Sequence, residues 1–462
     1  MNSAVVSSNT PLKTTQILKS LVVLGIPLII GELGSIAQQF ADTMMVGNHS
    51  TEELAASGLV NNIFLFVIFF TLGMSYAITP MVGNALGRKD FSSVTRTLLE
   101  GLIVNLALGF VCVILLLVLL FNIEILKQPE HILVYAKPYF IILICSVPFL
   151  TAFNALKQYL DGLGKTSISM WAMLVANVQN ILLNWILIYG KFGFPEMGLM
   201  GAGVSTLISR FLQFAILLVI ICFSKSQKEI RAQGDGILMK PTKEGVLYQF
   251  KLGLPISIQL SLEISIFSAC AIFMGWLGAY ELAAHQVMYT ISTLCFQVLY
   301  GIGAAGCILI SQLHGAGNIG NMRKTARTGF FFGLFVVGII ISSIAIFFRP
   351  LASCFTTSDD VIAVMRAILP WFVIYQVGDC MQITFGNALR GIEATRPLMI
   401  IAFVAYILVS IPLSYFLGSA DMLGVNGIWF GIPFGLTLAG LLFYFTFKKK
   451  CKKMELNADS AL

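Results

Sequence analysis

The stretch GLPISIQLSLEISIF, residues 253–267, indicates the fold of this chain. It is apolar along nearly its whole length, yet it carries one carboxylate, Glu263, close to its centre. An ionisable side chain at the middle of a membrane-spanning helix costs roughly 2.5–3.5 kcal/mol on insertion scales. Such residues are usually paired or functional, so the stretch raises the question of what this carboxylate does.

The 462-residue chain as a whole has the composition of a membrane protein. Hydrophobic residues make up 57% of it and charged residues 11%, whereas a soluble domain carries roughly a quarter charged residues. Apolar segments of about 20 or more residues are long enough to cross a bilayer as helices, and they lack the ten-residue alternation of a barrel strand. We predict an all-α polytopic protein with twelve transmembrane helices, at residues 17–41, 58–83, 97–121, 132–156, 167–190, 199–223, 249–273, 283–310, 328–348, 361–388, 397–417 and 424–447.

Lysine and arginine are unevenly distributed between the predicted connections. Those on the side of the two chain ends hold most of them, including the KKKCKK sequence that begins at Lys448. The positive-inside rule therefore places both termini in the cytoplasm. We expect a multi-pass protein of the bacterial cytoplasmic (inner) membrane. The formal charge of +7 is explained by this topology, and we expect no nucleic-acid partner.

The chain repeats itself in the same direction. LGIP at 24–27 recurs as LGLP at 252–255, and at the same offset of 228 the sequence ELAA at 53–56 recurs at 281–284. Six spans in each half make the two repeats parallel, an arrangement typical of secondary transporters with sites near the bilayer midplane. The predicted division is an N-terminal six-helix lobe at 1–223, a cytoplasmic linker at 224–248, a C-terminal six-helix lobe at 249–448 and a cytoplasmic tail at 449–462.

Polar residues inside the spans of the first lobe form one group of candidates. Asn177, Asn180 and Asn184 lie at i, i+3 and i+7, so they share one helix face, and such a face must point away from lipid. Asp42 in the first span is the obvious partner for this stripe. Glu32 is a further acid, and we assign it with the asparagines to an N-lobe polar cavity. Hydrogen bonding between helices remains an alternative role for all of them.

The second lobe carries the other candidates. Tyr375 and Asp379 lie at i, i+4 and share a helix face with Gln382 nearby, and Pro255 can bend the helix that carries Glu263. Carboxyl groups shielded from water take up protons more readily, and carboxylate and hydroxyl oxygens also suit a hard cation such as Na⁺. We predict that Asp42, Glu263, Tyr375 and Asp379 couple H⁺ or Na⁺ movement to transport, with a possible Na⁺ site at Glu263, Tyr375 and Asp379 and no other cofactor.

Two further sets of residues have open roles. Arg210 is the one basic residue predicted deep in a span of the first lobe, and we interpret it as a structural counter-ion. Aromatic rings can bind organic cations through cation–π contacts, so Phe267 and Tyr289 are candidates for a substrate cavity, with Trp276 and Trp371 as further ring candidates. Gln382 is a polar candidate for the same cavity. Packing or lipid contact is the alternative for each aromatic residue.

Several motifs resemble the multidrug and toxic compound extrusion (MATE) family. They are ADTMMVG in the first span, the repeated ELAA, AAHQ at 283–286 and ALRGIEATRP at 388–397. The resemblance covers nearly the whole chain and is strongest to the NorM-type branch. It implies a twelve-helix antiporter of two six-helix lobes that expels organic cations and other drugs in exchange for H⁺ or Na⁺. It also implies a first-lobe acid at Asp42, first-lobe asparagines at Asn177 and Asn180, and a second-lobe cation site at Glu263, Tyr375 and Asp379.

The sequence departs from the wider family at two positions. Asn184 stands near a position where the DinF-like branch carries an acid, and this departure argues against coupling that runs solely through the first lobe. Glu32 is an acid that we cannot match to the family.

Two other functional classes are weighed against the antiporter. A lipid-linked saccharide flippase of the same wider superfamily would need basic residues in its cavity, and the spans hold more acids than bases. An intramembrane aspartyl protease would need a GxGD sequence, and the first glycine is missing at Gln376. The chain also lacks HExxH, GxSxG and Walker sequences. We predict a monomeric transporter of cationic and amphipathic drugs, working in a lipid bilayer, and not an enzyme.

Overall fold

A computed structural model describes residues 11–233, 240–419 and 422–459, and almost all of them are helical. Within this part of the chain, twelve helical segments are long and apolar enough to cross a membrane, and each predicted span falls on one of them. The predicted fold class is therefore confirmed. Most of the segments begin or end several residues beyond the predicted span, because their terminal turns are polar and carry no apolar signal.

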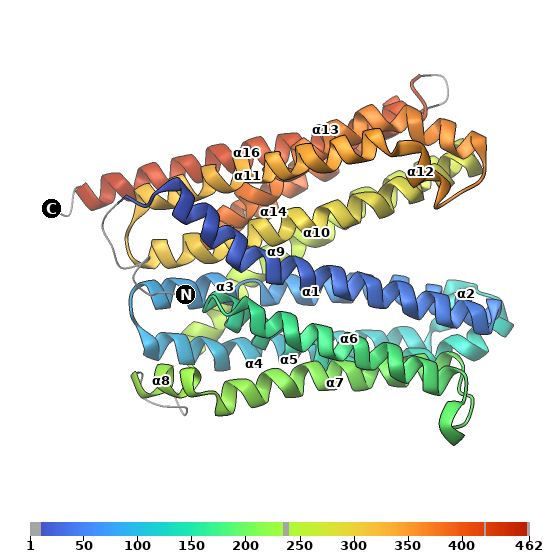
Figure 1. Ribbon diagram of the computed structural model, residues 1–462, viewed down its shortest axis with the longest axis horizontal. Helices are drawn as coiled ribbons and strands as arrows, with labels where there is room; N and C mark the ends of the chain where they lie inside the picture. The colour runs from blue at the N-terminus through green and yellow to red at the C-terminus, as the bar shows by residue number, and fades with distance from the viewer. Residues whose placement is uncertain (1–10, 234–239, 420–421, 460–462) are drawn as a thin grey trace. The chain divides into compact units, whose positions relative to one another are not determined.

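The helices of the first repeat are short-looped and follow one another directly (Figure 1). Their bounds are α1 Thr14–His49, α2 Thr51–Ser75, α3 Ile78–Gly87, α4 Phe91–Phe121, η1 Ile123–Leu126, α5 Glu130–Gly162, α6 Thr166–Ile188, η2 Lys191–Gly193, α7 Leu199–Phe223 and α8 Lys225–Gln233. The second repeat contains α9 Lys243–Leu277, α10 Ala279–Gly315, α11 Ile319–Ile346, α12 Phe348–Ser353, α13 Asp359–Gly391, α14 Arg396–Ala402, η3 Phe403–Ser410, α15 Ile411–Leu417 and α16 Val425–Asp459.

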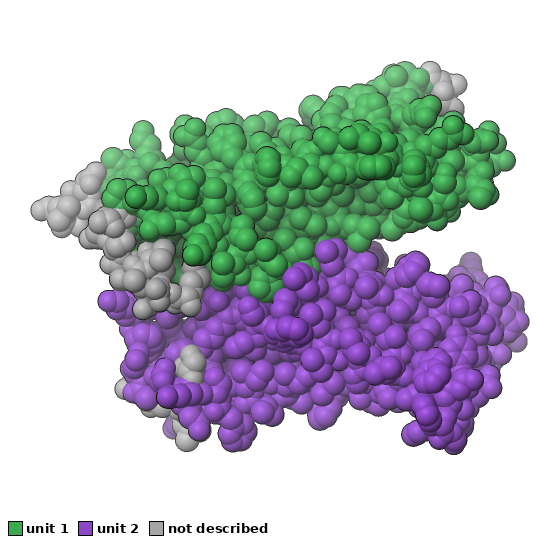
Figure 2. Space-filling model, viewed as in Figure 1, with its two compact units in different colours: residues 1–29, 258–462 green, residues 30–257 purple. Residues whose placement is uncertain are grey.

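The chain forms two compact units, which Figure 2 shows in different colours. One unit contains residues 1–29 and 258–462, and the other contains residues 30–257. We call them the 258–462 unit and the 30–257 unit. The units are divided inside α1 and α9 and not at the connection near residues 224–248. The division into lobes that the sequence repeat suggests stays a prediction.

Two glycines that match in the sequence repeat explain why the units divide inside α1 and α9. A Cβ atom on Gly73 of α2 would stand 2.5 Å from the Cα atom of Ser257 in α9. A Cβ atom on Gly301 of α10 would stand 2.4 Å from Cγ1 of Ile29 in α1. Glycine allows two helix backbones to approach this closely. The opening part of each repeat's first helix therefore packs on the second helix of the other repeat.

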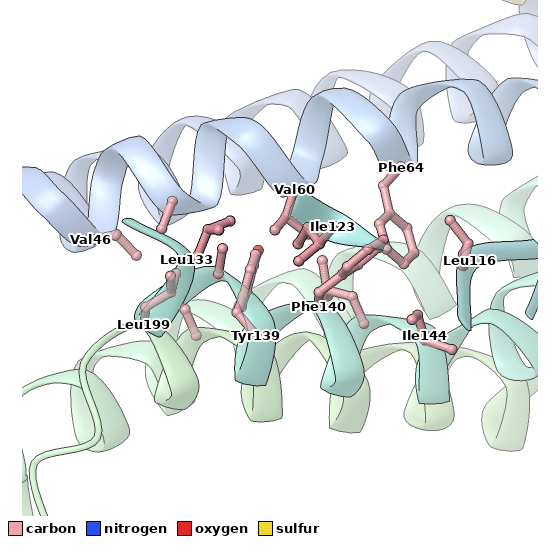
Figure 3. Packing of buried hydrophobic residues seen from close by; sticks show 14 of the residues in the cluster. Val46, Val60, Phe64, Leu116, Ile123, Leu133, Tyr139, Phe140, Ile144 and Leu199 are labelled. Atoms are coloured by element: carbon pink, nitrogen blue, oxygen red, sulfur yellow. The ribbon is translucent and has the colours of Figure 1, made fainter. Parts of the chain in front are cut away.

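Helix α5 is the central helix of the 30–257 unit and contacts α2, α3, α4, α6 and α7. Figure 3 shows the apolar cluster around it, in which the rings of Phe64 and Phe140 meet edge to face at 5.8 Å. Its last three turns, residues 151–162, are buried along their whole length. Any polar side chain on those turns is consequently held inside the protein.

Helix α13 has the same place in the 258–462 unit, where it contacts α10, α11 and α16. The long helices α13 and α16 run side by side (Figure 1). The helix α14–η3–α15 widens to a π-helix at η3, just before Pro412. Proline has no N–H group and leaves a carbonyl of the preceding turn unpaired, so it favours such a local irregularity.

Matched caps begin α4 and α11, 228 residues apart. The Oδ1 atom of Asp90 accepts a hydrogen bond from the backbone N–H of Ser93 at 3.0 Å, and Oδ1 of Asn318 accepts one from the N–H of Asn321 at 3.1 Å. The Ser93 hydroxyl also donates to Asp90 at 2.6 Å. These bonds from Ser93, the hydroxyl first, lower the pKa of Asp90 below its ordinary value. Asp and Asn are equally good residues at this position.

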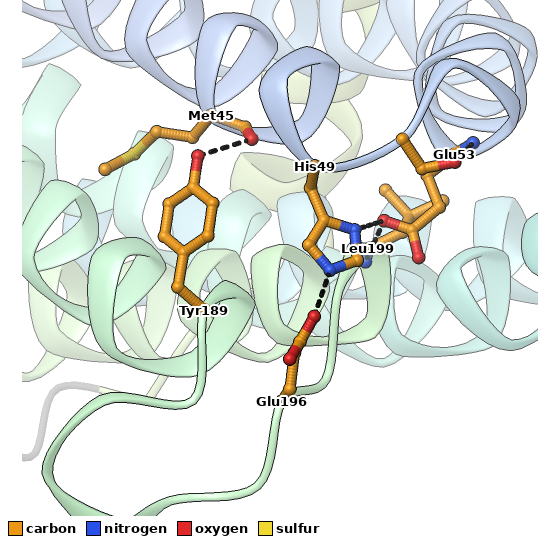
Figure 4. A network of polar contacts seen from close by, with 7 residues as sticks. Met45, His49, Glu53, Tyr189, Glu196 and Leu199 are labelled. Atoms are coloured by element: carbon orange, nitrogen blue, oxygen red, sulfur yellow. Dashed lines mark hydrogen bonds and ion pairs between the residues drawn. The ribbon is translucent and has the colours of Figure 1, made fainter.

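A polar network joins the end of α1 to the connection between α6 and α7 (Figure 4). The ring of His49 contacts Glu53 at 2.8 Å and Glu196 at 2.9 Å, one carboxylate at each nitrogen. Both nitrogens can donate only in the imidazolium form. Glu53 also accepts the backbone N–H of Leu199 at 2.9 Å. Gly198 has φ +52, and a Cβ atom there would stand 2.3 Å from the Glu53 carboxylate, so glycine is required.

Candidate functional site

The structure brings Asp42 together with the asparagine stripe, as expected from the sequence. Asn184 of α6 donates its Nδ2–H to the carboxylate of Asp42 in α1. The same Nδ2 atom donates to Oδ1 of Asn180 at 3.3 Å, and Asn180 donates to the hydroxyl of Ser205 in α7 at 3.1 Å. A chain of hydrogen bonds therefore runs from α1 through α6 to α7, with both asparagines fully buried.

Asn177 is buried on the same face of α6 but lies outside this chain of hydrogen bonds. Neither its amide oxygen nor its amide nitrogen has a partner within the described residues. An unpaired polar group that is shielded from water costs about 1–3 kcal/mol, so this amide is suited to a water molecule or a ligand.

Arg210 lies in α7 of the same unit, where its guanidinium donates to the Ser146 hydroxyl at 2.5 Å and stands over the ring of Phe64 at 5.9 Å. Its charge also interacts with the carboxylate of Asp42. The interpretation as a structural counter-ion agrees with these contacts.

Glu32, which we group with the asparagines from the sequence, contacts a basic residue of α5. Its carboxylate contacts the ammonium of Lys157 in α5 at 3.4 Å, and the same ammonium contacts Asp161 at 3.3 Å. Ser169 completes the cluster by donating to Asp161 at 2.9 Å. Lys157 lies just beyond the predicted span 132–156, but α5 continues to Gly162 and buries this side chain.

In the 258–462 unit, Glu263 accepts two amide hydrogen bonds on one oxygen. Gln259, one turn earlier on α9, and Gln382 of α13 each donate to Oε2 of Glu263 at 3.0 Å. Arg390 of α13 donates to the amide oxygen of Gln259 at 2.7 Å. All four side chains are buried, so the predicted carboxylate lies within a polar network that joins α9 to α13.

Asp379 lies on the same helix as Gln382 and is 1% exposed. Neither of its carboxylate oxygens has a partner within the described residues, and the same is true of both polar atoms of the Gln376 amide. The carboxyl groups of Asp379 and Glu263 are close enough to interact electrostatically. Two like charges shielded from water repel, so this pair requires a proton or a cation for both to remain buried.

Aromatic rings surround one side of this pair. The ring of Phe267 stands 5.2 Å from that of Tyr289 and 6.2 Å from that of Tyr375. The predicted substrate residues Phe267 and Tyr289 are therefore neighbours of the acidic pair, and Gln382 donates a hydrogen bond to Glu263. Trp276 and Trp371 lie elsewhere: Trp276 is 67% exposed, and Trp371 donates to Asn426 at 3.1 Å.

A metal centre of the usual kind is not formed by the described part of the chain. No group of three or more His, Cys, Asp or Glu side chains there is arranged to hold a metal ion. A Na⁺ ion at Glu263 and Asp379 would need hydroxyl and amide oxygens as well. The Tyr375 hydroxyl and the unpaired oxygens of Gln376 and Gln382 are of the right chemical type.

Comparisons with known proteins agree with this architecture. The sequence profile of the family described as MatE matches residues 27–186 and again residues 255–416. This chain belongs to the MatE family. The two matches start 228 residues apart, which is the offset of the sequence repeat. The predicted membership is confirmed, and as a member of a transporter family the chain is not an enzyme.

The relatives are also similar over nearly their whole length. The multidrug resistance protein NorM of Photobacterium profundum is 31% identical over 435 residues, which cover 92% of this chain and 93% of that protein. The multidrug resistance protein MdtK of Yersinia pseudotuberculosis is 28% identical, with the same coverage. An outward-facing multidrug resistance MATE family transporter of known structure has a TM-score of 0.85 at 21% identity, over 96% of this chain and 99% of that one. The protein is therefore a NorM-like, multi-pass membrane protein.

Four charged or amide residues of the Glu32–Lys157 and Glu263–Arg390 clusters were missed from the sequence as site residues. Lys157 and Asp161 were hidden because they lie in the last turns of a span, where a charged residue suggests the membrane surface. Arg390 was hidden for the same reason, and Gln259 was hidden because it is uncharged. The sequence does hold one signal: Gln259 and Glu263 lie at i, i+4 on an apolar helix, the spacing of neighbours on one face.

Proposed function

We propose that this protein is a secondary active antiporter that expels organic cations and related drugs in exchange for H⁺ or Na⁺. The observation that carries the proposal is the buried Asp379, whose carboxylate has no partner within the described residues, beside Glu263 and a group of aromatic rings. The names of the relatives, which are multidrug resistance proteins, support the class of substrate.

The exchange follows from competition for charge. The coupling cation binds at Glu263 and Asp379, with the Tyr375 hydroxyl as a further oxygen ligand, and Asp42 is a second group that takes up the ion. Binding of the ion lowers the affinity for the cationic drug, and the drug leaves to the outside. Antiport requires this negative coupling between the two ligands. The two lobes then move so that the site opens to the inside of the cell, and the ion is released there.

The aromatic side chains supply the drug contacts in this proposal. Phe267 and Tyr289 lie beside the carboxylates, and the faces of aromatic rings attract organic cations. Asn177, with both polar atoms unpaired among the described residues, is a candidate contact in the first lobe. We further propose that the protein is a monomer of the bacterial inner membrane with both termini in the cytoplasm.

The test is efflux of ethidium from proteoliposomes that contain the purified protein. A pH gradient and a Na⁺ gradient are imposed separately. Efflux driven by Na⁺ without a pH gradient identifies Na⁺ as the coupling ion, and efflux driven only by the pH gradient identifies H⁺. Efflux under neither gradient contradicts the proposal and favours the flippase with a lipid-linked substrate.

A further inference from the structure

Arg390 lies beside the proposed cation site and is not one of its proposed ligands. It is buried, and hydrogen bonds connect its guanidinium to Glu263 through the side chain of Gln259. The three residues come from two helices: Gln259 and Glu263 lie one turn apart on α9, and Arg390 lies in the last turn of α13. The end of α13 is thereby connected to the carboxylate in the middle of α9.

The arginine fixes the direction of this connection. A guanidinium has only donors, so Gln259 must present its amide oxygen to Arg390. Its NH₂ group then points to Glu263 and donates there. Without the arginine the amide is free to turn over and to present its oxygen to the carboxylate, which would be repulsive. Arg390 therefore keeps a donor directed at Glu263.

The arginine also fixes the charge of the cluster. Glu263 and Asp379 carry two negative charges when both are ionised, and Arg390 always carries one positive charge. The sum is −1, which one monovalent cation neutralises. We propose that Arg390, acting through Gln259, is a positioning residue that sets the affinity of the Glu263–Asp379 site so that one cation binds and is released in each cycle. The inference rests on the proposed function of that site.

The size of the effect follows from the length of the connection. Two hydrogen bonds through one amide hold a guanidinium nitrogen of Arg390 at most about 8 Å from a carboxylate oxygen of Glu263, and with an effective dielectric constant of about 20 a unit charge there changes cation affinity by roughly thirtyfold. Removal of the charge should make the site bind its cation more tightly and release it more slowly.

The experiment measures ethidium efflux from proteoliposomes at a series of concentrations of the cation that drives the wild type. In Arg390→Met we expect the half-saturating cation concentration to fall at least about tenfold, together with the maximal rate. Arg390→Lys keeps the charge and should restore the half-saturating concentration to within about threefold of wild type. A purely structural role would lower the maximal rate alone.

Two more variants keep the test decisive. Gln259→Leu retains the arginine but breaks its connection to Glu263, and it should lower the half-saturating cation concentration several-fold. This variant can be measured even if Arg390→Met does not fold. Arg323→Met removes a partly exposed arginine that pairs with Glu455 at 2.8 Å in the same unit, and it should leave the half-saturating concentration unchanged.

The outcomes separate the two proposals. If the wild type shows no gradient-driven efflux, the proposed function is wrong. If the wild type transports but the half-saturating cation concentration is unchanged or raised in Arg390→Met, or unchanged in Gln259→Leu, the inference about Arg390 is wrong and the proposed function stands.

Discussion

Removal of the ammonium group of Lys157 should destabilise the 30–257 unit strongly. This side chain is 7% exposed and stands between Glu32 at 3.4 Å and Asp161 at 3.3 Å. In Lys157→Met the aliphatic volume is largely kept, so packing changes little. The carboxylates of Glu32 and Asp161 lose the positive charge that lies between them, and their mutual repulsion is no longer compensated.

The expected cost can be worked out from the burial of each partner. Removal of one partner of a buried ion pair costs about 3–5 kcal/mol, because a buried charge is left alone. The side chain of Asp161 is 4% exposed, so its charge would be left buried and alone. The side chain of Glu32 is 25% exposed, so its charge is only partly buried. We therefore expect about 3 kcal/mol for Lys157→Met and about 1 kcal/mol or less for Glu32→Gln.

Unfolding in mixed micelles of SDS and a mild detergent measures these free energies. The double variant Lys157→Met with Glu32→Gln should be about 1 kcal/mol more stable than the sum of the single variants predicts, since the second change removes one of the stranded charges. Lys251→Met is the control, because Lys251 is exposed in the same unit. A free energy of unfolding for Lys157→Met within about 0.5 kcal/mol of wild type, the scatter of surface substitutions, would refute the reasoning.

Three other changes test different parts of the structure. Asp379→Asn should abolish gradient-driven ethidium efflux in proteoliposomes while ethidium binding persists, and efflux at the wild-type rate would count against the coupling site. Gly301→Val should lower the free energy of unfolding by about 1–3 kcal/mol through overpacking against Ile29, whereas Gly306→Ala, with nothing within 4 Å of its Cβ position, should not. Asp90→Ala should cost about 1 kcal/mol as a lost cap. Because hydrogen bonds lower the pKa of Asp90, its stabilisation is present above the ordinary pKa and is lost as the pH falls through the lowered value; Asp90→Asn should remove that pH dependence of thermal unfolding.

The spans could be predicted because the requirement for membrane insertion is directly visible in the sequence. A helix in lipid must be apolar for about 20 residues, and each of the twelve predicted segments meets this condition. The apolar pattern does not show at which residue a helix stops packing on helices of its own repeat and packs on a helix of the other repeat instead. The close contacts of Gly73 with α9 and of Gly301 with α1 depend on which helices meet. A single glycine in an apolar span does not indicate which helix packs against it.

The candidate site could be predicted in part for a related reason. A carboxylate in the middle of a span, such as Glu263 or Asp379, is costly enough to be conspicuous. A base near the end of a span is not conspicuous, because lysine and arginine there usually extend to the membrane surface. Lys157 and Arg390 look like such residues, and only the burial of the last turns of α5 and α13 shows that they face inward.

Both repeats place a base beside buried acids, but they use different residues at different positions. Asp161 of α5 matches Arg390 of α13 at an offset of 229, so a carboxylate in one repeat stands where a guanidinium stands in the other. In the 30–257 unit the base is instead Lys157, one turn earlier, and it contacts an acid of α1; in the 258–462 unit Arg390 is connected to an acid of α9. Each cluster thus joins the central helix of its unit to a first helix of a repeat, and each contains two acids and one base. A buried charge must be compensated wherever it stands, and each cluster meets this requirement by placing a base beside its acids, although the base comes from a different position of the central helix.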